Sequence, residues 1–574
     1  MRYVAIPCSI LRHLRPYVLV PFLGLLALFL AYPIFMVVYA SFKGGPPGVD
    51  TPFSFEGYTR AWSEWATYKA LITTFALAVP RVLTGVIFAI FATWIITRTN
   101  TPLRWFFEEM IWLKLFLPIL PMVMAWLLIA GGRSGVLNKF LMDVLNLSKP
   151  PLDIQSYWGV IFYSFMLSGS FFFLYMAPAF RNMDASLEES SRVSGASNIR
   201  TLFRITVPMM MPAILGVTLL VFLFVLSSYE IELFFLAPKG AYVFSTWIWW
   251  EASKIPPDYP SAMAMSSVFL IFVAIVIYLQ SKILGGRQFV TVTGRGFGVR
   301  LLDLGKWRWA AFAFMASWTL VGLVLPMVML ILGTVQNAYG VLGSGYTLDY
   351  WREALGRPSI IRSFRNTLML GFMAASAGVI LYGLMSYIYI RTRLRGRQLI
   401  EILSWVPRAA PGVVLSLGIA WAALGGIPGL DFLYGSLFLM AAVILLEATP
   451  QGMRMMNGGM VQLSAELEEA SRVSGGSWSH TMRRVVVPLL MPTLLHAWLL
   501  IFRGATSALV VLLFIYRPSS KVLAIDIFER MLTNQPQQAA ILGVLLTAIS
   551  MVVAIVARVL AFRQRRSLEI GGGV

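Results

Sequence analysis

Charged side chains are scarce in this sequence. Asp, Glu, Lys and Arg make up 13% of its 574 residues, whereas hydrophobic residues make up 58%. An ordinary soluble domain carries about 25% charged residues. A soluble protein of this length would need a charged surface that this chain cannot supply. The composition therefore indicates that lipid covers much of the exterior.

Cysteine and histidine are also nearly absent. Cys8 is the only cysteine, and the three histidines are scattered along the chain, so neither a disulfide framework nor a metal site is indicated. A phosphate-binding loop is missing, because Gly305-Lys306 lacks both the earlier glycine and the following hydroxyl residue. No catalytic set of residues is visible. We expect neither ATP hydrolysis nor a bound cofactor in this chain alone.

Long apolar runs are what the sequence has instead. Each run exceeds the roughly 20 residues that a helix needs to cross about 30 Å of hydrocarbon. They predict an all-α polytopic membrane protein with twelve transmembrane helices. The expected spans are 17–42, 70–97, 109–131, 155–180, 208–236, 261–281, 309–334, 366–390, 399–424, 432–453, 488–516 and 538–562.

Basic residues give the chain a formal net charge of +20. Two clusters follow predicted spans directly: Arg391, Arg393, Arg395 and Arg397, and then Arg558, Arg563, Arg565 and Arg566. Loops rich in Lys and Arg stay in the cytoplasm, so the pattern predicts a bacterial inner-membrane protein with both termini cytoplasmic. Membrane orientation explains the basicity, and no nucleic-acid partner is expected.

An internal repeat defines the organisation. Residues 187–212 recur at 467–492 without gaps, and 15 of the 26 positions are identical. Each copy follows the fourth span of its half, and both lie on one side of the membrane. The pattern predicts two parallel six-helix repeats. We expect a first half at 1–284 with a loop at 184–207, a Gly- and Arg-rich cytoplasmic linker at 285–308, and a second half at 309–574 with a loop at 464–487.

The repeated segment has the pattern of a helix, a glycine and a second helix. Ser186 and Glu189 have capping-box spacing, and Gly195 suits the left-handed residue that ends a helix. Ser197 is expected to cap a second helix that runs to a turn before Pro208. The element is too short and polar to span the bilayer. It forms either a docking knob or an interfacial helix that stiffens the loop.

The motif Glu189-Ser-Ser-x3-Gly195, with Pro208 further on, and its copy Glu469-Ala-Ser-x3-Gly475, with Pro488, resemble the EAA loop of binding-protein-dependent ABC importer permeases. In that family the loop holds a coupling helix that sits in a cleft of the ATP-binding subunit. The resemblance implies two copies of an ATP-binding cassette subunit, which hold ATP and Mg, and a periplasmic solute-binding protein. It implies these coupling residues: Glu188, Glu189, Gly195, Pro208, Glu468, Glu469, Gly475 and Pro488.

The stretch from Glu466 to Arg563 further resembles fused permeases of the ferric iron type, which are related to thiamine, phosphonate and polyamine permeases. Gly504 replaces an expected acid and Glu447 an expected base, so the cargo stays open between ferric iron and a small organic ion. The expected function is transport by alternating access. The alternatives are a secondary transporter driven by an ion gradient and, less favoured by the motifs, a membrane enzyme.

Ionisable residues inside predicted spans are costly, at about 2.5–3.5 kcal/mol each at mid-membrane, and should face the interior or an aqueous path. They either form structural pairs or contact the transported ion, and Lys114 and Glu232 could lie at an interface. The candidates for the translocation path are Arg81, Glu230, Arg408, Glu447 and Arg503. Glu230 and Arg503 lie at corresponding places of the two halves, and we expect them to form either a gate that pairs across the pseudo-two-fold axis or a mixed site for an ion.

An aromatic loop, Tyr242–Tyr259, is predicted on the periplasmic side and contains Trp247, Trp249 and Trp250. Interfacial aromatic residues commonly anchor a membrane protein. Docking of a solute-binding protein is the alternative interpretation.

Overall fold

The computed structural model describes residues 16–571 except 285–300, 342, 393–395 and 427–430. Cys8, most of the predicted linker, and Arg393 and Arg395 of the first basic cluster lie outside the described residues. The side chains of Arg563, Arg565 and Arg566 lie outside them as well. The described part is built of helices, and its only β-type pairing is three isolated bridges. The predicted all-α fold is confirmed.

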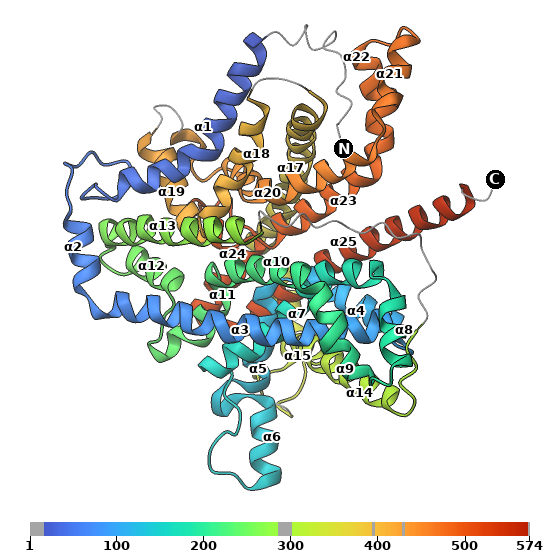
Figure 1. The fold of residues 1–574 in the computed structure, drawn as a ribbon. Coiled ribbons are helices and arrows are strands. Elements are labelled where there is room, and N and C mark those ends of the chain that lie inside the picture. The colour runs from blue at the N-terminus through green and yellow to red at the C-terminus, as the bar shows by residue number, and fades with distance from the viewer. Residues whose placement is uncertain (1–15, 285–300, 342, 393–395, 427–430, 572–574) are drawn as a thin grey trace.

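The first half of the chain contains thirteen α-helices (Figure 1). Five of them are short and lie outside the apolar spans. The helices are α1 (Pro16–Ala40), α2 (Glu56–Ser63), α3 (Trp65–Arg98), α4 (Arg104–Phe116), α5 (Ile119–Ala130), α6 (Val136–Leu145), α7 (Tyr157–Asn182), α8 (Ala185–Val193), α9 (Asn198–Thr201), α10 (Val207–Leu226), α11 (Glu230–Phe235), α12 (Phe244–Ser253) and α13 (Tyr259–Leu284).

The second half repeats this order. Its helices are α14 (Trp307–Thr319), α15 (Leu325–Val335), α16 (Asp349–Gly356), α17 (Pro358–Arg391), α18 (Arg397–Trp405), α19 (Gly412–Trp421), α20 (Leu437–Gln462), α21 (Ala465–Val473), α22 (Trp478–Thr481), α23 (Val487–Thr506), α24 (Leu523–Leu532) and α25 (Pro536–Gly571). Two pairs of matching long helices have equal lengths: α3 and α17 have 34 residues each, and α7 and α20 have 26 each.

Ten described helices are long and apolar enough to span a membrane, and two bent helix pairs bring the number to twelve. Each of the twelve predicted spans has a counterpart, but the fifth and the eleventh were predicted ten residues too late: they run from Asn198 to Leu226 and from Trp478 to Thr506, not over 208–236 and 488–516. The third and ninth are broken: α4 meets α5, and α18 meets α19, each at 105°. A proline begins the second helix of each pair and pushes the preceding residue into the extended region. Leu117 before Pro118 and Ala410 before Pro411 are both extended.

The α4–α5 pair crosses the bundle alongside α7. At its start, Glu108 of α4 forms an ion pair of 2.6 Å with Arg181 at the end of α7. At its end, Ala130 accepts a hydrogen bond of 3.1 Å from the amide of Ile154, shortly before α7 begins. The pair therefore reaches opposite ends of an antiparallel neighbour and is a broken span, not a re-entrant loop.

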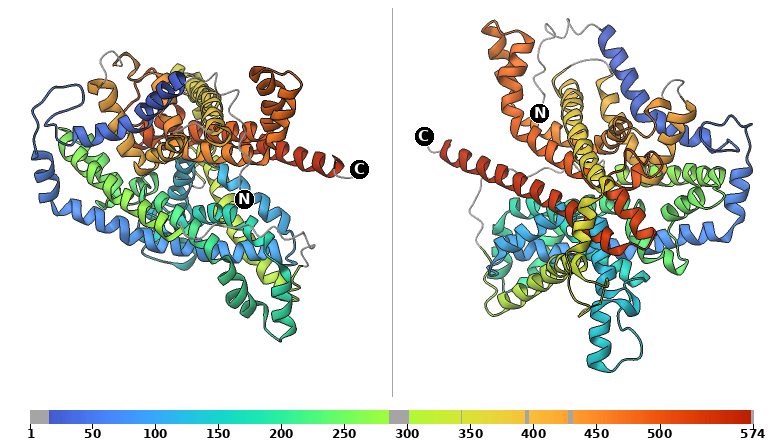
Figure 2. Two further views of the ribbon diagram at one scale, coloured as in Figure 1. Left: turned by 45° about the horizontal axis from the view of Figure 1, so that its top comes forward. Right: turned by 180° about the vertical axis from the view of Figure 1, so that it is seen from behind.

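The first span of each half packs on the other half. Helix α1 packs mainly on α19, with smaller contacts to α13 of its own half and to α18. Helix α15 packs on α5 and on α25 of its own half, and α14 packs on α4 (Figure 1). The main hydrophobic core consequently runs through both halves. The loops that carry α8 and α21 lie on the same side of the molecule as the end of α25, as all views show (Figure 2).

Candidate coupling surface and translocation path

The two repeated loops fold alike. In each, a nine-residue helix is followed by a glycine and then by a second short helix. Gly195 and Gly475 have φ of +85° and +83°, the left-handed conformation that the sequence predicted and that L side chains adopt only with strain. Ser197 and Ser477 cap the second helices as predicted for Ser197, accepting from the amides three residues on.

The start of the first loop helix differs from the prediction. Asp184 and not Ser186 is the N-cap of α8, and its carboxylate accepts a hydrogen bond of 2.9 Å from the Ser186 amide. This bond holds the pKa of Asp184 below its ordinary value. Ser464 caps α21 in the equivalent place. The prediction was wrong by two residues because Asp also fits the capping position.

The predicted turn before Pro208 is absent. Five π-helical residues, Leu202–Thr206, join α9 to α10, and Met482–Val486 do the same before α23. A π-helical turn absorbs the missing N–H and the bulk of Pro208 and Pro488 without ending the helix. Each loop is consequently continuous with a membrane span, from Asn198 to Leu226 and from Trp478 to Thr506.

An arginine at the end of the second span of each half holds the loop. Arg98 lies 3.8 Å from the carboxylate of Glu188 and donates to the carbonyls of Phe180 and Met183. Glu188 is only 3% exposed and also accepts from Thr206 at 2.6 Å. A buried carboxylate needs such partners. These contacts fix the start of α8 to the end of α3.

The second half has the equivalent contact. Arg391 lies 3.2 Å from Glu468 and donates to the carbonyls of Met460 and Leu463. Glu468 also accepts from Tyr387 at 3.2 Å and lies 4.0 Å from Arg472. We call the Arg98–Glu188 and Arg391–Glu468 contacts the two clamps. Their arginines were not predicted as site residues, although an Arg-Thr pair ends the second span of both halves.

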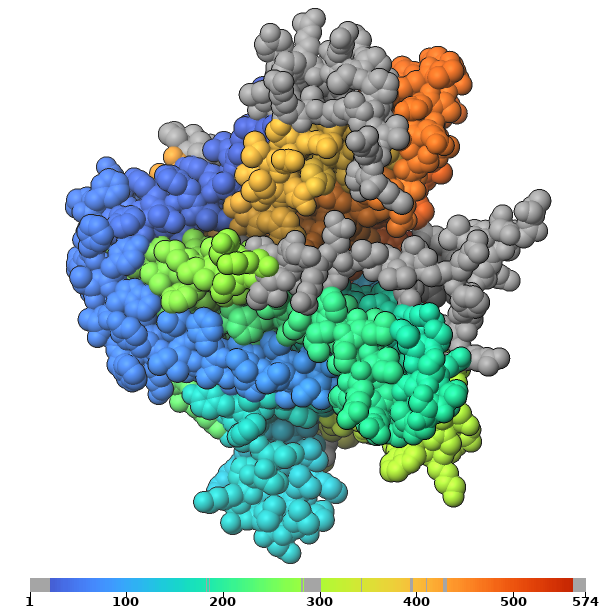
Figure 3. All heavy atoms as spheres, in the orientation of Figure 1, coloured from blue at the N-terminus to red at the C-terminus, as the bar shows by residue number. Residues whose placement is uncertain are grey.

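The rest of each loop is open to solvent. Glu189 is exposed and Glu469 half-buried, and Val193 and Val473 are each 90% exposed. In the space-filling view the two loops lie on one edge of the molecule (Figure 3). Exposed apolar residues rimmed by charge are typical of an interaction surface.

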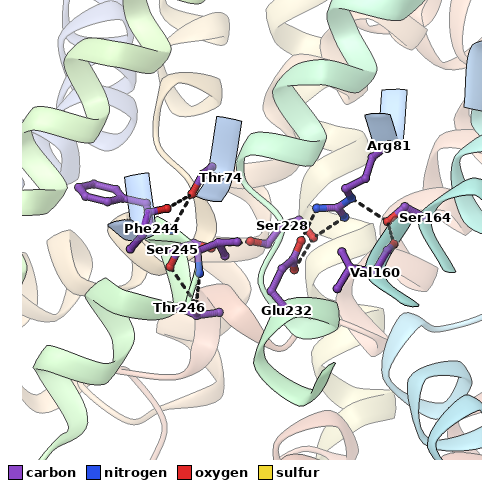
Figure 4. Close-up of polar contacts among 11 residues, drawn as sticks. Thr74, Arg81, Val160, Ser164, Ser228, Glu232, Phe244, Ser245 and Thr246 are labelled. Carbon is purple, nitrogen blue, oxygen red and sulfur yellow. Dashed lines mark hydrogen bonds and ion pairs between the residues drawn. The ribbon is translucent and has the colours of Figure 1, made fainter. Parts of the chain in front are cut away.

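Arg81, a predicted path residue, is sealed inside the first half (Figure 4). Its guanidinium forms an ion pair with Glu232 of α11 and donates to Ser164 at 2.7 Å and Ser228 at 3.1 Å. Ser228 in turn donates to Glu232. Both charges are satisfied inside this network, so the arrangement is that of a structural pair.

The other four candidates lie where the halves meet. Arg408 of η5 (Val406–Ala409) rests on the ring of Phe224 of α10, 3.7 Å from its centre. Arg408 attracts Glu447, which also interacts with Glu230 of the other half. Glu447 keeps accessible surface although residues of both halves surround it.

Arg503 of α23 reaches across to the break in the first half. Its guanidinium donates to the carbonyls of Phe116 and Leu117, at 3.5 and 3.2 Å, between α4 and α5. Arg503 also attracts Glu230, but no ion pair within 4 Å joins them among the described residues. The same span that continues the second loop thus contacts the broken helix of the opposite half.

The doubled helix frame, the two loops continuous with spans and the charged seam between the halves define a membrane permease. The family of binding-protein-dependent transport system inner membrane components matches residues 85–290 and 368–566. These segments cover more than half of the chain, which belongs to this family. The match falls once on each half, in agreement with the resemblance drawn from the loops.

Several curated relatives are similar to this chain in sequence. The ferric transport system permease protein FbpB of Actinobacillus pleuropneumoniae is 26% identical over 74% of this chain and 61% of its own length. The probable ABC transporter permease protein y4fN of Sinorhizobium fredii is 25% identical, over 76% and 77%. The spermidine/putrescine permease PotC of Haemophilus influenzae is 22% identical over 42% and 91%. The chain therefore spans about three fifths of the ferric relative.

Among solved structures, a bacterial ABC transporter that imports alginate is similar at 16% identity, with a TM-score of 0.38. The match covers 45% of this chain and 96% of that one.

Proposed function

We propose that this chain is the fused permease subunit of an ATP-driven importer in the bacterial inner membrane. Two copies of an ATP-binding subunit dock on the loops at 184–207 and 464–487, and both termini are cytoplasmic. A periplasmic solute-binding protein delivers the cargo to the opposite side. The observation that carries the proposal is the pair of clamped loops, each continuous with a membrane span.

The physical route for coupling follows from that continuity. ATP binding draws the two partner subunits together, and the loops with them. Because α9 and α22 run without a break into α10 and α23, a displaced loop tilts its span. Arg503 on α23 then moves against the carbonyls at the α4–α5 break. The pore opens outward, and hydrolysis returns it inward.

The cargo is proposed from the relatives. Three relatives are named for ferric or Fe(3+) transport, and others for spermidine and putrescine transport. Ferric iron or a small organic ion is accordingly the proposed substrate class.

The coupling role is tested by the glycines. Gly195→Val with Gly475→Val places β-branched residues at φ above +80°, which strains both turns. Gly240→Val is the matched control, since Gly240 also has positive φ (+70°) and open space at its Cβ but lies outside the loops. Purified complexes with the ATP-binding subunits are compared for ATP hydrolysis stimulated by the binding protein.

We expect the loop variant to insert normally and to lose stimulation, whereas the Gly240 variant keeps it. Full stimulation in the loop variant refutes the docking role. Uptake by the chain alone in vesicles with an ion gradient and no ATP-binding subunit would instead favour a secondary transporter.

A further inference from the structure

Lys114 lies near the end of α4 and has no salt partner in the part of the chain that the structure describes. It is 6% exposed, and its ammonium has no hydrogen-bond acceptor among the described residues. No described carboxylate lies close enough to compensate the charge of its ammonium group. Its one charge-stabilising contact is the face of Trp318, whose centre lies 4.3 Å from Nζ.

The helix opposite Lys114 is shaped to receive its ammonium. Residues Leu320–Val324 are π-helical, and Gly322 lies in this segment. A Cβ on Gly322 would lie 2.5 Å from Nζ of Lys114, so any other residue would force the lysine away. Bulges of this kind are frequent at functional sites. The seventh span, formed by α14 and α15, thus has a glycine where the ammonium group of Lys114 approaches it.

A pocket opens beside Lys114 at the break of the third span. Its cavity volume is about 20 Å³, and its wall includes Leu117, Trp126, Tyr163 and Leu167. Helix α5 begins in this wall at Ile119 without a side-chain cap. The first amides of a helix lack intrahelical acceptors and carry partial positive charge. The ammonium and the helix start therefore meet at one pocket.

The second half contains a charge that the first half lacks. With the offset of 280 residues between α7 and α20, Leu167 corresponds to Glu447. Glu447 attracts Arg408. Pro118 and Pro411, at the two helix breaks, are 293 residues apart, so Lys114 corresponds to Pro407, and Arg408 is the next residue. In the first half the carboxylate is replaced by Leu167, and the pocket is left beside the cation.

From these contacts we infer that the pocket beside Lys114 binds an oxyanion, a carboxylate or phosphate group, of the transported solute. The inference rests on the proposed function and narrows its substrate to solutes that carry such a group. Lys114 is the eleventh of the 27 residues from Arg104 to Ala130 and so lies near the middle of the broken third span. Lipid headgroups lie far from that depth, which favours a solute over a lipid as the source.

The test measures binding to the full chain in nanodiscs of phosphatidylcholine. The probes are acetate, inorganic phosphate and citrate, with spermidine at equal ionic strength as the cationic control. Thermal unfolding is followed for wild type, Lys114→Met and Gly322→Ser. Lys69→Gln is the matched control, because Lys69 is an exposed lysine on α3.

We expect at least one of the three anions, and not spermidine, to raise the unfolding temperature of wild type and Lys69→Gln. Charge-assisted hydrogen bonds contribute enough that losing Lys114 should weaken apparent affinity about tenfold to a hundredfold. Lys114→Met should raise the unfolding temperature without ligand, since it removes an unpaired buried charge, so loss of binding is separable from misfolding.

Three results would overturn the inference: no stabilisation of wild type by any of the three anions, equal stabilisation of Lys114→Met, or stabilisation by spermidine instead. Stabilisation that requires phosphatidylglycerol in the nanodisc would overturn the assignment to a solute. None of these readouts involves an ATP-binding subunit, so they are independent of the coupling test.

Discussion

The two halves share one helix frame and differ in its interior. With the offset of 293 residues between α3 and α17, Arg81 corresponds to Ala374, and with the loop offset of 280, Glu232 corresponds to Leu512. A buried ion pair in one half is thus an apolar contact region in the other, where both residues are fully buried. The same helix frame holds an ion pair in the first half and two apolar residues in the second. We therefore expect Arg81 and Glu232 to be replaceable by apolar residues together but not singly.

Other interior contacts are identical in both halves. Thr74 accepts a hydrogen bond from the first amide of α12 at 2.7 Å, and Thr367 accepts one from the first amide of α24 at 2.8 Å. Ser191 with Thr201, and Ser471 with Thr481, are hydrogen-bonded at 2.9 Å within the loops. The shared contacts position helix ends, whereas the differing ones lie between spans.

The largest loss of unfolding free energy is expected for the Arg81–Glu232 ion pair, which the second half lacks. Arg81→Ala leaves Glu232 charged, buried and unpaired, and should cost about 3–5 kcal/mol of unfolding free energy. Arg81→Ala with Glu232→Leu copies the second half and should recover most of this loss. Unfolding in mixed detergent micelles measures both.

Arg357→Ala is the control for that comparison, because its ion pair with Glu353 is partly exposed. Exposed pairs contribute about 1 kcal/mol or less. If the double variant is no more stable than Arg81→Ala, the apolar arrangement of the second half does not transfer to the first.

The clamps should differ in strength. Arg98→Gln removes the cation nearest to Glu188, whereas after Arg391→Gln the carboxylate of Glu468 still has Tyr387 and Arg472. We expect Arg98→Gln to reduce stimulated ATP hydrolysis about tenfold and Arg391→Gln by a few-fold, given about 1.5–3 kcal/mol for a charged hydrogen bond.

Arg352→Gln, at an exposed arginine of α16 that precedes the start of α17, at the opposite end of that helix from Arg391, should leave hydrolysis unchanged. The reverse order of the two clamp variants would mean that Thr206 alone suffices to hold Glu188 and that the second loop dominates coupling.

A smaller effect on ATP hydrolysis is expected from Arg503 and Glu230, which lie where the two halves meet. Arg503→Ala and Glu230→Ala should each lower basal ATP hydrolysis of the complex by a few-fold, because each leaves a charge without its counterpart. The double variant should recover part of the loss. Simple addition of the two losses would assign Arg503 to its bonds with Phe116 and Leu117, and would remove Glu230 from the pair.

The smallest effect concerns the loop caps. The pKa of Asp184 is held below 3.8 by its bond to the Ser186 amide, so its contribution to α8 is present above that pH. As the pH falls through the lowered pKa, the carboxylate is protonated and the contribution is lost. Ser464 does not titrate. Amide exchange in α8 should therefore accelerate at low pH more than in α21, and Asp184→Ala should abolish the difference.

Hydropathy predicted the spans well because a membrane helix satisfies its own backbone and its length is set by the bilayer. The glycines of the loops were predictable for a similarly local reason, since positive φ favours glycine. The 105° breaks were not predicted, although Pro118 and Pro411 mark them, because a proline inside a span more commonly only kinks it. Arg81 pairs with a residue 151 positions away, and no local pattern encodes such a contact.

The first span of the chain packs mainly on a helix that is synthesised much later. Helix α1 leaves the ribosome when its principal partner, α19, is still some 380 residues from being made. At about 5–20 residues per second, α1 stays in the membrane without that partner for roughly 20–75 s. During this interval its packing face is covered by lipid or by the insertion machinery, and a chain that stops early leaves the face permanently uncovered. Premature termination anywhere before α19 should therefore yield a product that membrane proteases recognise.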